Sequence, residues 1–238
     1  MAETILETHG LTMRFGGVVA SNNVNFKLKA HELRCLIGPN GAGKSTFFKC
    51  LTGLLTPTKG QVLMRGTETT GWHPHQIASL GVGIKTQVPN VLDGLTVEEN
   101  IWIAARRFVP PGEAKRRAAE IIDRLVLGPI ARAELGRLAH GERQRVELGM
   151  VVVGKPWLVL LDEPAAGMSA NDIDRMSDII REITRTAAVI IVEHDMQFIR
   201  SIADVVTVFH QGAIIMEDHV ERVMSDSLVR DVYLGKKA

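Results

Sequence analysis

The sequence predicts an α/β fold built on a mostly parallel sheet. Two short, continuous apolar runs, Trp157–Leu161 and Ala188–Val192, and a strand-like run at Leu33–Ile37 carry this prediction. Such runs are typical of strands that are buried on both faces. Segments with helical periodicity lie between them, including one with Ile173, Met176, Ile179, Ile180 and Ile183 on a single face. The 238 residues, 45% of them hydrophobic and 23% charged, suit one domain with a full core.

The two ends of the chain show a different pattern. Near the N-terminus Val24, Phe26 and Leu28 alternate with polar residues, which predicts a half-buried strand. Residues 1–30 therefore read as an antiparallel pair with a turn at two glycines, and 61–65 as a further short strand. At the other end, 205–209 and 213–216 predict a strand pair, and a short helix is expected to close the chain.

A glycine-rich segment follows the first buried strand. Gly38 to Ser45 reads G-P-N-G-A-G-K-S, which fits G-x-x-x-x-G-K-[ST], and a helix-like run leads out of it. The glycines let successive N–H groups face one anion, Lys44 can reach the β- and γ-phosphates of a nucleotide, and the Ser45 hydroxyl can bind Mg²⁺. The motif predicts a P-loop NTPase (RecA-like) core. The expected nucleotide-binding residues are Gly38, Pro39, Asn40, Gly41, Ala42, Gly43, Lys44, Ser45 and Thr46.

The middle of the chain interrupts the alternation of strands and helices. After a predicted strand at 81–87, a capping box at Thr96–Glu99 begins one helix, and a second runs from Glu113. We therefore expect a helical subdomain at 90–155, inserted between the 1–89 and 156–238 parts of a single catalytic α/β domain.

Polar residues follow two of the buried strands. Asp162 and Glu163 come after one, and His194 comes after the next. Beside a phosphate loop, Asp162 is suited to holding Mg²⁺, Glu163 to accepting a proton from an attacking water, and His194 to orienting the γ-phosphate. Capping of the following helix and an ordinary strand-end histidine are the alternatives. Phe15 ahead of the loop either stacks on adenine or packs in the core.

Other features point away from further chemistry. Cys35 and Cys50 lie in apolar surroundings and read as packing residues rather than a redox pair. His73 and His75 flank a proline in a predicted polar turn, where solvated side chains are more common than metal ligands. A net charge of +1 gives no general attraction to nucleic acid. The sequence shows neither a basic signal-peptide start nor a long apolar run, so we expect a soluble protein.

The motifs occur in the order found in ABC-transporter ATPases, and the resemblance covers essentially the whole chain. It rests on the phosphate loop, Gln87, the segment Leu138-Ala139-His140-Gly141-Glu142, Leu158–Glu163 and His194. The stretches 161–168 and 192–196 resemble the subgroup that serves branched-chain amino-acid and urea importers. The ending Val232–Gly235 resembles the urea-type member most.

The resemblance implies a head-to-tail dimer, formed with a second copy or a paralogue, that sandwiches two ATP molecules. Each ATP would lie between one phosphate loop and the partner's signature segment, here Ala139, His140, Gly141 and Glu142. Gln87 would contact Mg²⁺ or water near the docking site of a transmembrane permease, and Phe15 would stack on adenine. The protein would work on the cytoplasmic side of a bacterial inner membrane, indirectly with a solute-binding protein and without nucleic acid.

Two residues depart from the family pattern. The common signature L-S-G-G-Q is L-A-H-G-E here, so Ala139 lacks the hydroxyl that caps the helix and contacts the γ-phosphate. We expect the ATP site built with this signature to be the slower one in a heterodimer. Ser169, where many members have aspartate, is expected to alter coupling between the two sites.

Four classes of function are compatible with a phosphate loop. An ATPase subunit that powers an importer of small solutes explains all the motifs. Non-transport ABC proteins usually carry tandem halves, coiled-coil insertions or basic extensions, and this sequence shows none. A small-molecule kinase fits less well, because Glu163 beside Asp162 suits water as the acceptor. A complete catalytic set disfavours a binding-only module.

Overall fold

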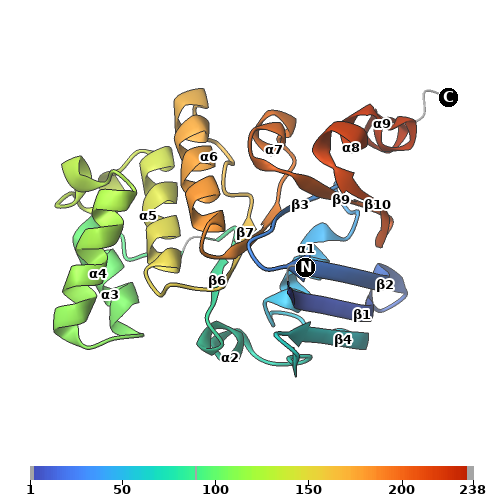
Figure 1. The fold of residues 1–238 in the computed structure, drawn as a ribbon, viewed down its shortest axis with the longest axis horizontal. Coiled ribbons are helices and arrows are strands. Elements are labelled where there is room, and N and C mark those ends of the chain that lie inside the picture. Colours follow the sequence, from blue (N-terminus) through green and yellow to red (C-terminus); the bar gives the residue numbers. More distant parts are fainter. Residues whose placement is uncertain (1–2, 89, 235–238) are drawn as a thin grey trace.

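The computed structural model describes residues 3–88 and 90–234, which form two sheets surrounded by helices (Figure 1). The larger sheet has the strand order β10-β9-β3-β8-β7-β6. Pairing is parallel from β9 through to β6, and β10 is an antiparallel edge strand. The bounds are β3 (Leu33–Ile37), β6 (Val82–Lys85), β7 (Leu158–Asp162), β8 (Ala188–Val192), β9 (Val205–His210) and β10 (Ala213–His219). The predicted parallel sheet is confirmed.

The smaller sheet is antiparallel, with the order β2-β1-β4-β5. Its strands are β1 (Thr4–Phe15), β2 (Val18–Lys29), β4 (Lys59–Met64) and β5 (Thr67–Glu68). Val24, Phe26 and Leu28 are buried, whereas Lys27 and Lys29 are exposed, so the predicted alternation is confirmed. Gly16 and Gly17 make the turn between the first two strands.

Three helices, α3, α4 and α5, lie together at one end of the molecule (Figure 1). The bounds of the helices are α1 (Lys44–Leu51), α2 (Pro74–Ser79), α3 (Val97–Arg106), α4 (Pro111–Arg124), α5 (His140–Val152), α6 (Ala170–Thr184), α7 (Met196–Ile202), α8 (Val220–Ser225) and α9 (Ser227–Leu234), with short 3₁₀ helices η1 (Gly128–Ile130) and η2 (Leu135–Arg137). The capping box is present, because Thr96 N–H donates to Glu99 Oε2 at 2.8 Å and Glu99 N–H donates to Thr96 Oγ1 at 3.2 Å. The subdomain boundaries at 89/90 and 155/156 stay a prediction.

Two sequence expectations need correction, and one helix was not predicted. The segment around His73 is the start of α2 rather than a polar turn, because Pro74 occupies the first helical position, where no N–H is needed. His73 N–H also donates to the Gln76 side chain at 2.9 Å. Helix α7 lies in a segment for which the sequence analysis made no prediction. The chain ends in two helices, α8 and α9, instead of one; Gly235 of the closing motif lies outside the described residues.

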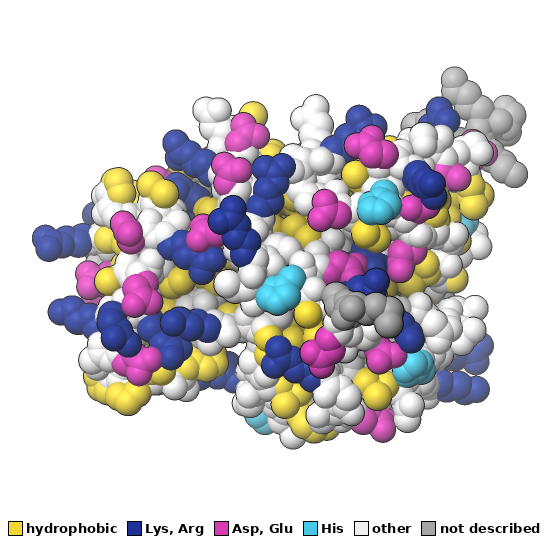
Figure 2. Space-filling model, in the orientation of Figure 1, with side chains coloured by type: hydrophobic (Ala, Val, Ile, Leu, Met, Phe, Trp, Pro, Cys, Tyr) yellow, Lys and Arg dark blue, Asp and Glu magenta, His cyan; other side chains and the backbone are white. Residues whose placement is uncertain are grey.

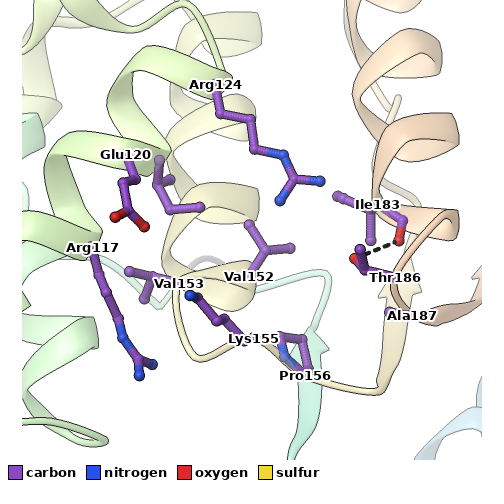
Figure 3. Close-up of a pocket in the computed structure, with 11 residues that line it drawn as sticks. Arg117, Glu120, Arg124, Val152, Val153, Lys155, Pro156, Ile183, Thr186 and Ala187 are labelled. Atoms are coloured by element: carbon purple, nitrogen blue, oxygen red, sulfur yellow. Dashed lines mark hydrogen bonds between the residues drawn. The ribbon is translucent and has the colours of Figure 1, made fainter.

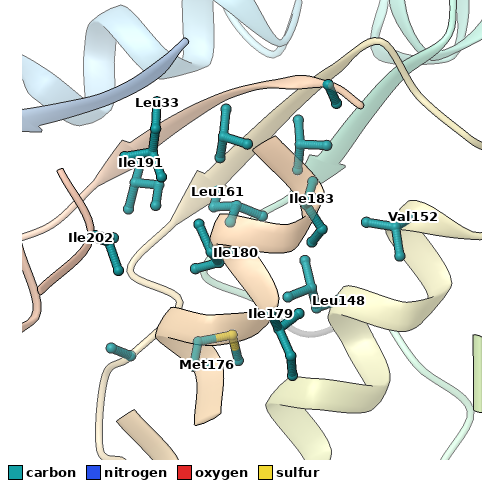
Figure 4. Packing of buried hydrophobic residues seen from close by; sticks show 14 of the residues in the cluster. Leu33, Leu148, Val152, Leu161, Met176, Ile179, Ile180, Ile183, Ile191 and Ile202 are labelled. Carbon is teal, nitrogen blue, oxygen red and sulfur yellow. The ribbon is translucent and has the colours of Figure 1, made fainter. Parts of the chain in front are cut away.

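The six-stranded sheet separates two hydrophobic cores. Along β7, Val159 and Leu161 face the core under α5, α6 and α7, whereas Leu158 and Leu160 face the core shared with α1 and the antiparallel sheet. Figure 4 shows the first core, in which Met176, Ile179, Ile180 and Ile183 of α6 pack toward the sheet. Within the described ranges, no helix is long and apolar enough to cross a membrane.

Candidate functional site

The parallel sheet brings the predicted site residues together at one edge. β3, β8, β7 and β6 are neighbours, and Asp162 pairs in register with Val192. Each strand carries a predicted site residue at its carboxyl end. The phosphate loop (Gly38–Ser45) follows β3, His194 follows β8, Asp162 and Glu163 end and follow β7, and Gln87 follows β6. In parallel sheets these ends meet at the edge where ligands bind. Residues far apart in the chain therefore converge because of strand order alone.

The phosphate loop has little freedom to move. Gly43 has a φ of +103°, and a Cβ at this position would lie 2.4 Å from the carbonyl oxygen of Ala20 on β2. Gly38 meets the same obstacle at the carbonyl of Phe209. At Gly41, by contrast, an added Cβ would have no atom of the described residues within 4 Å, so its surroundings are open. The loop is thus packed from behind by two strands and open at the side on which phosphate groups would approach.

Burial disfavours the charged forms of Lys44 in the phosphate loop and of Asp162 at the end of β7. Lys44 Nζ donates to the carbonyls of Gly38 at 2.6 Å and Pro39 at 3.1 Å. Desolvation lowers the pKa of Lys44, although Glu163 and Asp162 act in the opposite direction. Burial, together with the neighbouring Glu163, raises the pKa of Asp162. A buried carboxylate of this kind gains from a bound cation.

The donor set fits Mg²⁺, which usually takes one or two carboxylates together with substrate phosphates. Asp162 would supply the carboxylate. The Ser45 side chain, in the first turn of α1, would supply a hydroxyl, and Gln87 an amide oxygen. Among the described residues, no group of three or more His, Cys, Asp or Glu side chains is placed to hold a metal ion by itself.

Glu163 is the meeting point of the predicted catalytic side chains. Gln87 Nε2 donates to Glu163 Oε2 at 3.3 Å, and His194 Nδ1 lies 3.5 Å from Glu163 Oε1. Glu163 adopts a φ of +47°, a left-handed conformation that is rare outside glycine. Asp162 is buried at the end of β7, whereas the Glu163 carboxylate meets Gln87 and His194, so the two acids have different surroundings. Their separate roles stay a prediction.

One buried acid was not assigned a role from the sequence. Glu193 is 1% exposed, and its carboxylate accepts the N–H groups of Ala165 at 3.2 Å, His194 at 2.7 Å and Asp195 at 3.2 Å. It fixes the backbone that carries His194. The available signal was a charged residue directly after a buried strand, the same signal that pointed to Asp162 and Glu163.

Phe15 is 47% exposed at the end of β1, so the alternative of a core phenylalanine is wrong. It pairs with Val18 across the β1–β2 turn. β2 continues to Ala20, whose carbonyl packs against Gly43 of the phosphate loop. In the folded chain the exposed ring therefore lies beside the part of β2 that contacts the phosphate loop. Adenine stacking stays a prediction.

The signature segment (138–142) begins α5, with Ala139 at the N-cap position and no side-chain cap. Ala139 N–H donates to Glu142 Oε2 at 3.1 Å, which is one half of a capping box; the other half needs a hydroxyl that alanine lacks. His140 Nε2 lies 2.8 Å from the carbonyl oxygen of Ala166. The polar contacts described for His140 are thus this one to the 165–169 loop of the same chain and an approach of Gln144 Nε2 to the same ring nitrogen at 3.3 Å, and neither involves the phosphate loop.

A groove of about 680 Å³ separates the α2–β6 region from α3 and α5. Its apolar walls include Leu54, Val88, Ile103 and Phe108, all of which are partly exposed. At its base Lys85 of β6 forms an ion pair with Glu147 of α5 at 3.4 Å, and neither side chain is more than 5% exposed. The groove therefore links the strand that leads to Gln87 with the helix that begins at the signature segment.

A smaller hollow of about 380 Å³ lies between α4, the end of α5 and the end of α6 (Figure 3). Val152, Val153 and Ile183 line it, and Arg117, Arg124 and Lys155 stand around them. Both arginines have acidic partners, Glu113 and Glu182 respectively. The predicted site residues lie outside this hollow. Elsewhere on the face seen in Figure 2, basic and acidic side chains are interspersed.

Comparison with known proteins agrees with this geometry. The family model described as "ABC transporter" matches residues 21–166. The high-affinity branched-chain amino acid transport ATP-binding protein BraF of Pseudomonas aeruginosa is 35% identical over 99% of this chain and 100% of its own length. LivG of Escherichia coli (strain K12), described in the same words, is 34% identical with the same coverage.

Solved structures show the same fold. The crystal structure of the ADP conformation of an ATP-binding cassette of an ABC transporter has a TM-score of 0.89 and 26% identity, covering 98% of this chain and 100% of the other. A nucleotide-free cassette has a TM-score of 0.88 at 24% identity. With the phosphate loop, the converging acids and a family match over more than half of its length, the chain belongs to the ABC transporter family and is an ATP-hydrolysing cassette.

Proposed function

We propose that this chain is the ATP-binding and ATP-hydrolysing subunit of a membrane importer for small solutes. The observation that carries the proposal is the convergence of Gln87 and His194 on Glu163 beside the phosphate loop. Glu163 takes a proton from the attacking water, and His194 and Gln87 hold that water and the γ-phosphate in line. Lys44, the loop amides and the start of α1 stabilise the negative charge that develops on the phosphoryl group.

Mg²⁺ belongs to this proposal as the cofactor. Asp162, Ser45 and Gln87 would hold it, and when bound it neutralises charge on the β- and γ-phosphates. The raised pKa of Asp162 supports this role, because a cation offsets the cost of keeping its carboxylate ionised in a buried position.

A second cassette is the proposed partner at the phosphate loop, either another copy of this chain or a paralogue. Glu163, His194 and the loop come from this chain, and a signature segment comes from the partner. Phe15 stacks on the adenine ring. Another cassette, 22% identical to this chain, is described as a dimeric structure.

Permease subunits are the proposed partners at the groove. Its apolar walls suit a short amphipathic helix, and Gln87 lies two residues beyond the buried Lys85 at its base. The chain would then work at the cytoplasmic face of a bacterial inner membrane, with a solute-binding protein supplying cargo on the other side. The relatives' names favour branched-chain amino acids as cargo; urea and related amides are the alternative within the proposal.

The proposal is tested by the steady-state ATPase activity of the purified chain beside Glu163→Gln, across protein concentration. We expect activity to rise faster than linearly with protein concentration and to fall at least about 100-fold in the variant, the usual scale for removing a general base. Nucleotide binding should persist in both proteins. Activity that Glu163→Gln leaves untouched would refute the assignment of the base.

Identifying the cargo requires the assembled transporter. Co-expression with candidate permease and solute-binding subunits, followed by ATPase assays in proteoliposomes, compares stimulation by leucine and by urea. Stimulation by one solute alone identifies the cargo. If the chain is inactive alone despite binding ATP and becomes active with a related cassette, the working dimer contains two different subunits.

A further inference from the structure

The side chain of His140 connects the signature segment to the loop that follows the catalytic glutamate. Its Nε2 lies 2.8 Å from the carbonyl oxygen of Ala166. A carbonyl only accepts hydrogen bonds, so in this contact Nε2 carries the hydrogen that is donated, and the Gln144 side-chain nitrogen 3.3 Å from the same Nε2 makes no hydrogen bond with it. The ring also packs over Gly167, where an added Cβ would lie 3.5 Å from Nε2 and Cδ2.

A second contact holds the same two segments together. Gly141 packs so closely on Asp172 of α6 that an added Cβ would lie 2.6 Å from its carboxyl group. Asp172 is itself held by Ser169, because Ser169 Oγ donates to Asp172 Oδ2 at 2.6 Å. The start of α5 therefore contacts the 165–169 loop near both of its ends, directly at Ala166 and Gly167 and through Asp172 at Ser169.

The other side of the loop is tied to the residues that face the chain's own nucleotide. Ala165 N–H donates to Glu193 Oε1, while Glu193 Oε2 accepts the N–H groups of His194 and Asp195. Because the Glu193 carboxylate is 1% exposed, its geometry is set by these donors rather than by water. A continuous polar path thus runs from His194 through Glu193 and the loop to His140.

We propose that His140 is a positioning residue that passes engagement of ATP at this chain's own phosphate loop to its signature segment. The inference rests on the proposed function, in which the two ends of the path serve different ATP molecules: His194 faces the chain's own ATP, and the signature faces the partner's. When the γ-phosphate holds His194, the loop is held through Glu193, and His140 then holds the start of α5.

The path lies within one chain, so it can be tested without a partner. Hydrogen–deuterium exchange of residues 138–146 is measured with and without ATP in Glu163→Gln protein, chosen so that bound ATP is not hydrolysed, at concentrations where light scattering shows a monomer. Three further variants are compared in that background. His140→Phe keeps the ring volume and loses the donor, His140→Gln keeps an N–H donor, and His9→Phe is a matched control on the exposed face of β1.

ATP should slow exchange at 138–146 about two- to tenfold, the range that one net hydrogen bond supports. His140→Gln and His9→Phe should keep this slowing, and His140→Phe should lose it while binding ATP equally well. Equal slowing in His140→Phe, or bound ATP without slowing in the parent protein, overturns this inference alone. Absence of ATP binding in the parent, measured in the same samples, overturns the proposed function and this inference with it.

Discussion

The phosphate-loop edge and the signature segment contribute to nucleotide chemistry in different ways. At the edge, Lys44, Asp162, Glu163 and His194 present functional side chains that influence or contact one another. At the signature, Ala139 has no functional group, and His140 is bonded to the chain's own loop. In the proposed dimer, the backbone and the partial positive charge at the start of α5 would remain for a partner's nucleotide. The chain would thus bring side-chain chemistry to its own site and mainly backbone to the other.

The largest effect should come from breaking the edge itself with Asp162→Asn. We expect Mg²⁺-dependent ATP hydrolysis to fall at least about 100-fold, because in the proposed site the metal would lose its carboxylate ligand. The same change should stabilise the metal-free protein near neutral pH. The pKa of Asp162 is raised in the folded state, so its ionised form destabilises folding at pH values above that raised pKa.

The sign can be checked by urea denaturation with EDTA at several pH values. The stability advantage of Asp162→Asn should be greatest above the folded-state pKa of Asp162. It should then shrink as the pH falls through that value toward the lower pKa of the unfolded chain, because the wild-type carboxyl becomes neutral in both states. An advantage that grows on acidification would contradict the burial argument.

An intermediate effect, on protein stability, should follow from breaking the Lys85–Glu147 ion pair, which joins β6 to α5 at the groove. Lys85→Met leaves the buried Glu147 with only the longer contact to Arg143 Nε at 3.8 Å, and removing one member of a buried ion pair typically costs about 3 kcal/mol. The double change Lys85→Met with Glu147→Leu should recover most of this loss, because no unpaired charge remains. Urea denaturation of the three proteins measures both values. If Lys85→Met alone costs less than about 0.5 kcal/mol, the ion pair does not join the regions.

The features of the edge were largely predictable from the sequence. The parallel strands, the phosphate loop and the order of the acids were predicted because each depends on a local pattern: an apolar run, a glycine spacing, or a polar residue after a strand. Convergence on Glu163 itself was not predicted; it follows from the adjacency of β6, β7 and β8 in the sheet. The capping box at Thr96 was predicted to the residue for the same local reason.

Residues whose roles depend on distant partners were not predicted. Lys85 read as part of a core strand, and Glu147 as one charge on a helix; only packing of β6 against α5 makes them a buried pair. The bond from His140 to Ala166 spans 26 positions and needs the folded loop. Helix α2 was missed because Pro74, read as a turn residue, is equally suited to the first turn of a helix.

The smallest effect is expected from a change that gives the signature segment a functional side chain of its own. Ala139→Ser supplies the missing N-cap hydroxyl at a position whose φ of −61° and ψ of 154° already suit a cap. An N-cap of this kind contributes about 1 kcal/mol, which corresponds to a rise in melting temperature of about 2–4 °C for a chain of this size. Ala139→Cys is the matched control, because it adds similar bulk but only a weak acceptor.

Turnover separates a structural role of that hydroxyl from a functional one. If serine also contacts the partner's γ-phosphate, ATPase activity of the assembled dimer should rise about tenfold, the scale of one hydrogen bond to a charged group. Higher melting temperature with unchanged turnover would mean that the backbone of the signature segment suffices for the partner's site. The missing hydroxyl of Ala139 would then not slow ATP hydrolysis at the site completed by this signature segment. Any difference in rate between the two ATP sites would have to arise from the catalytic acids of the partner.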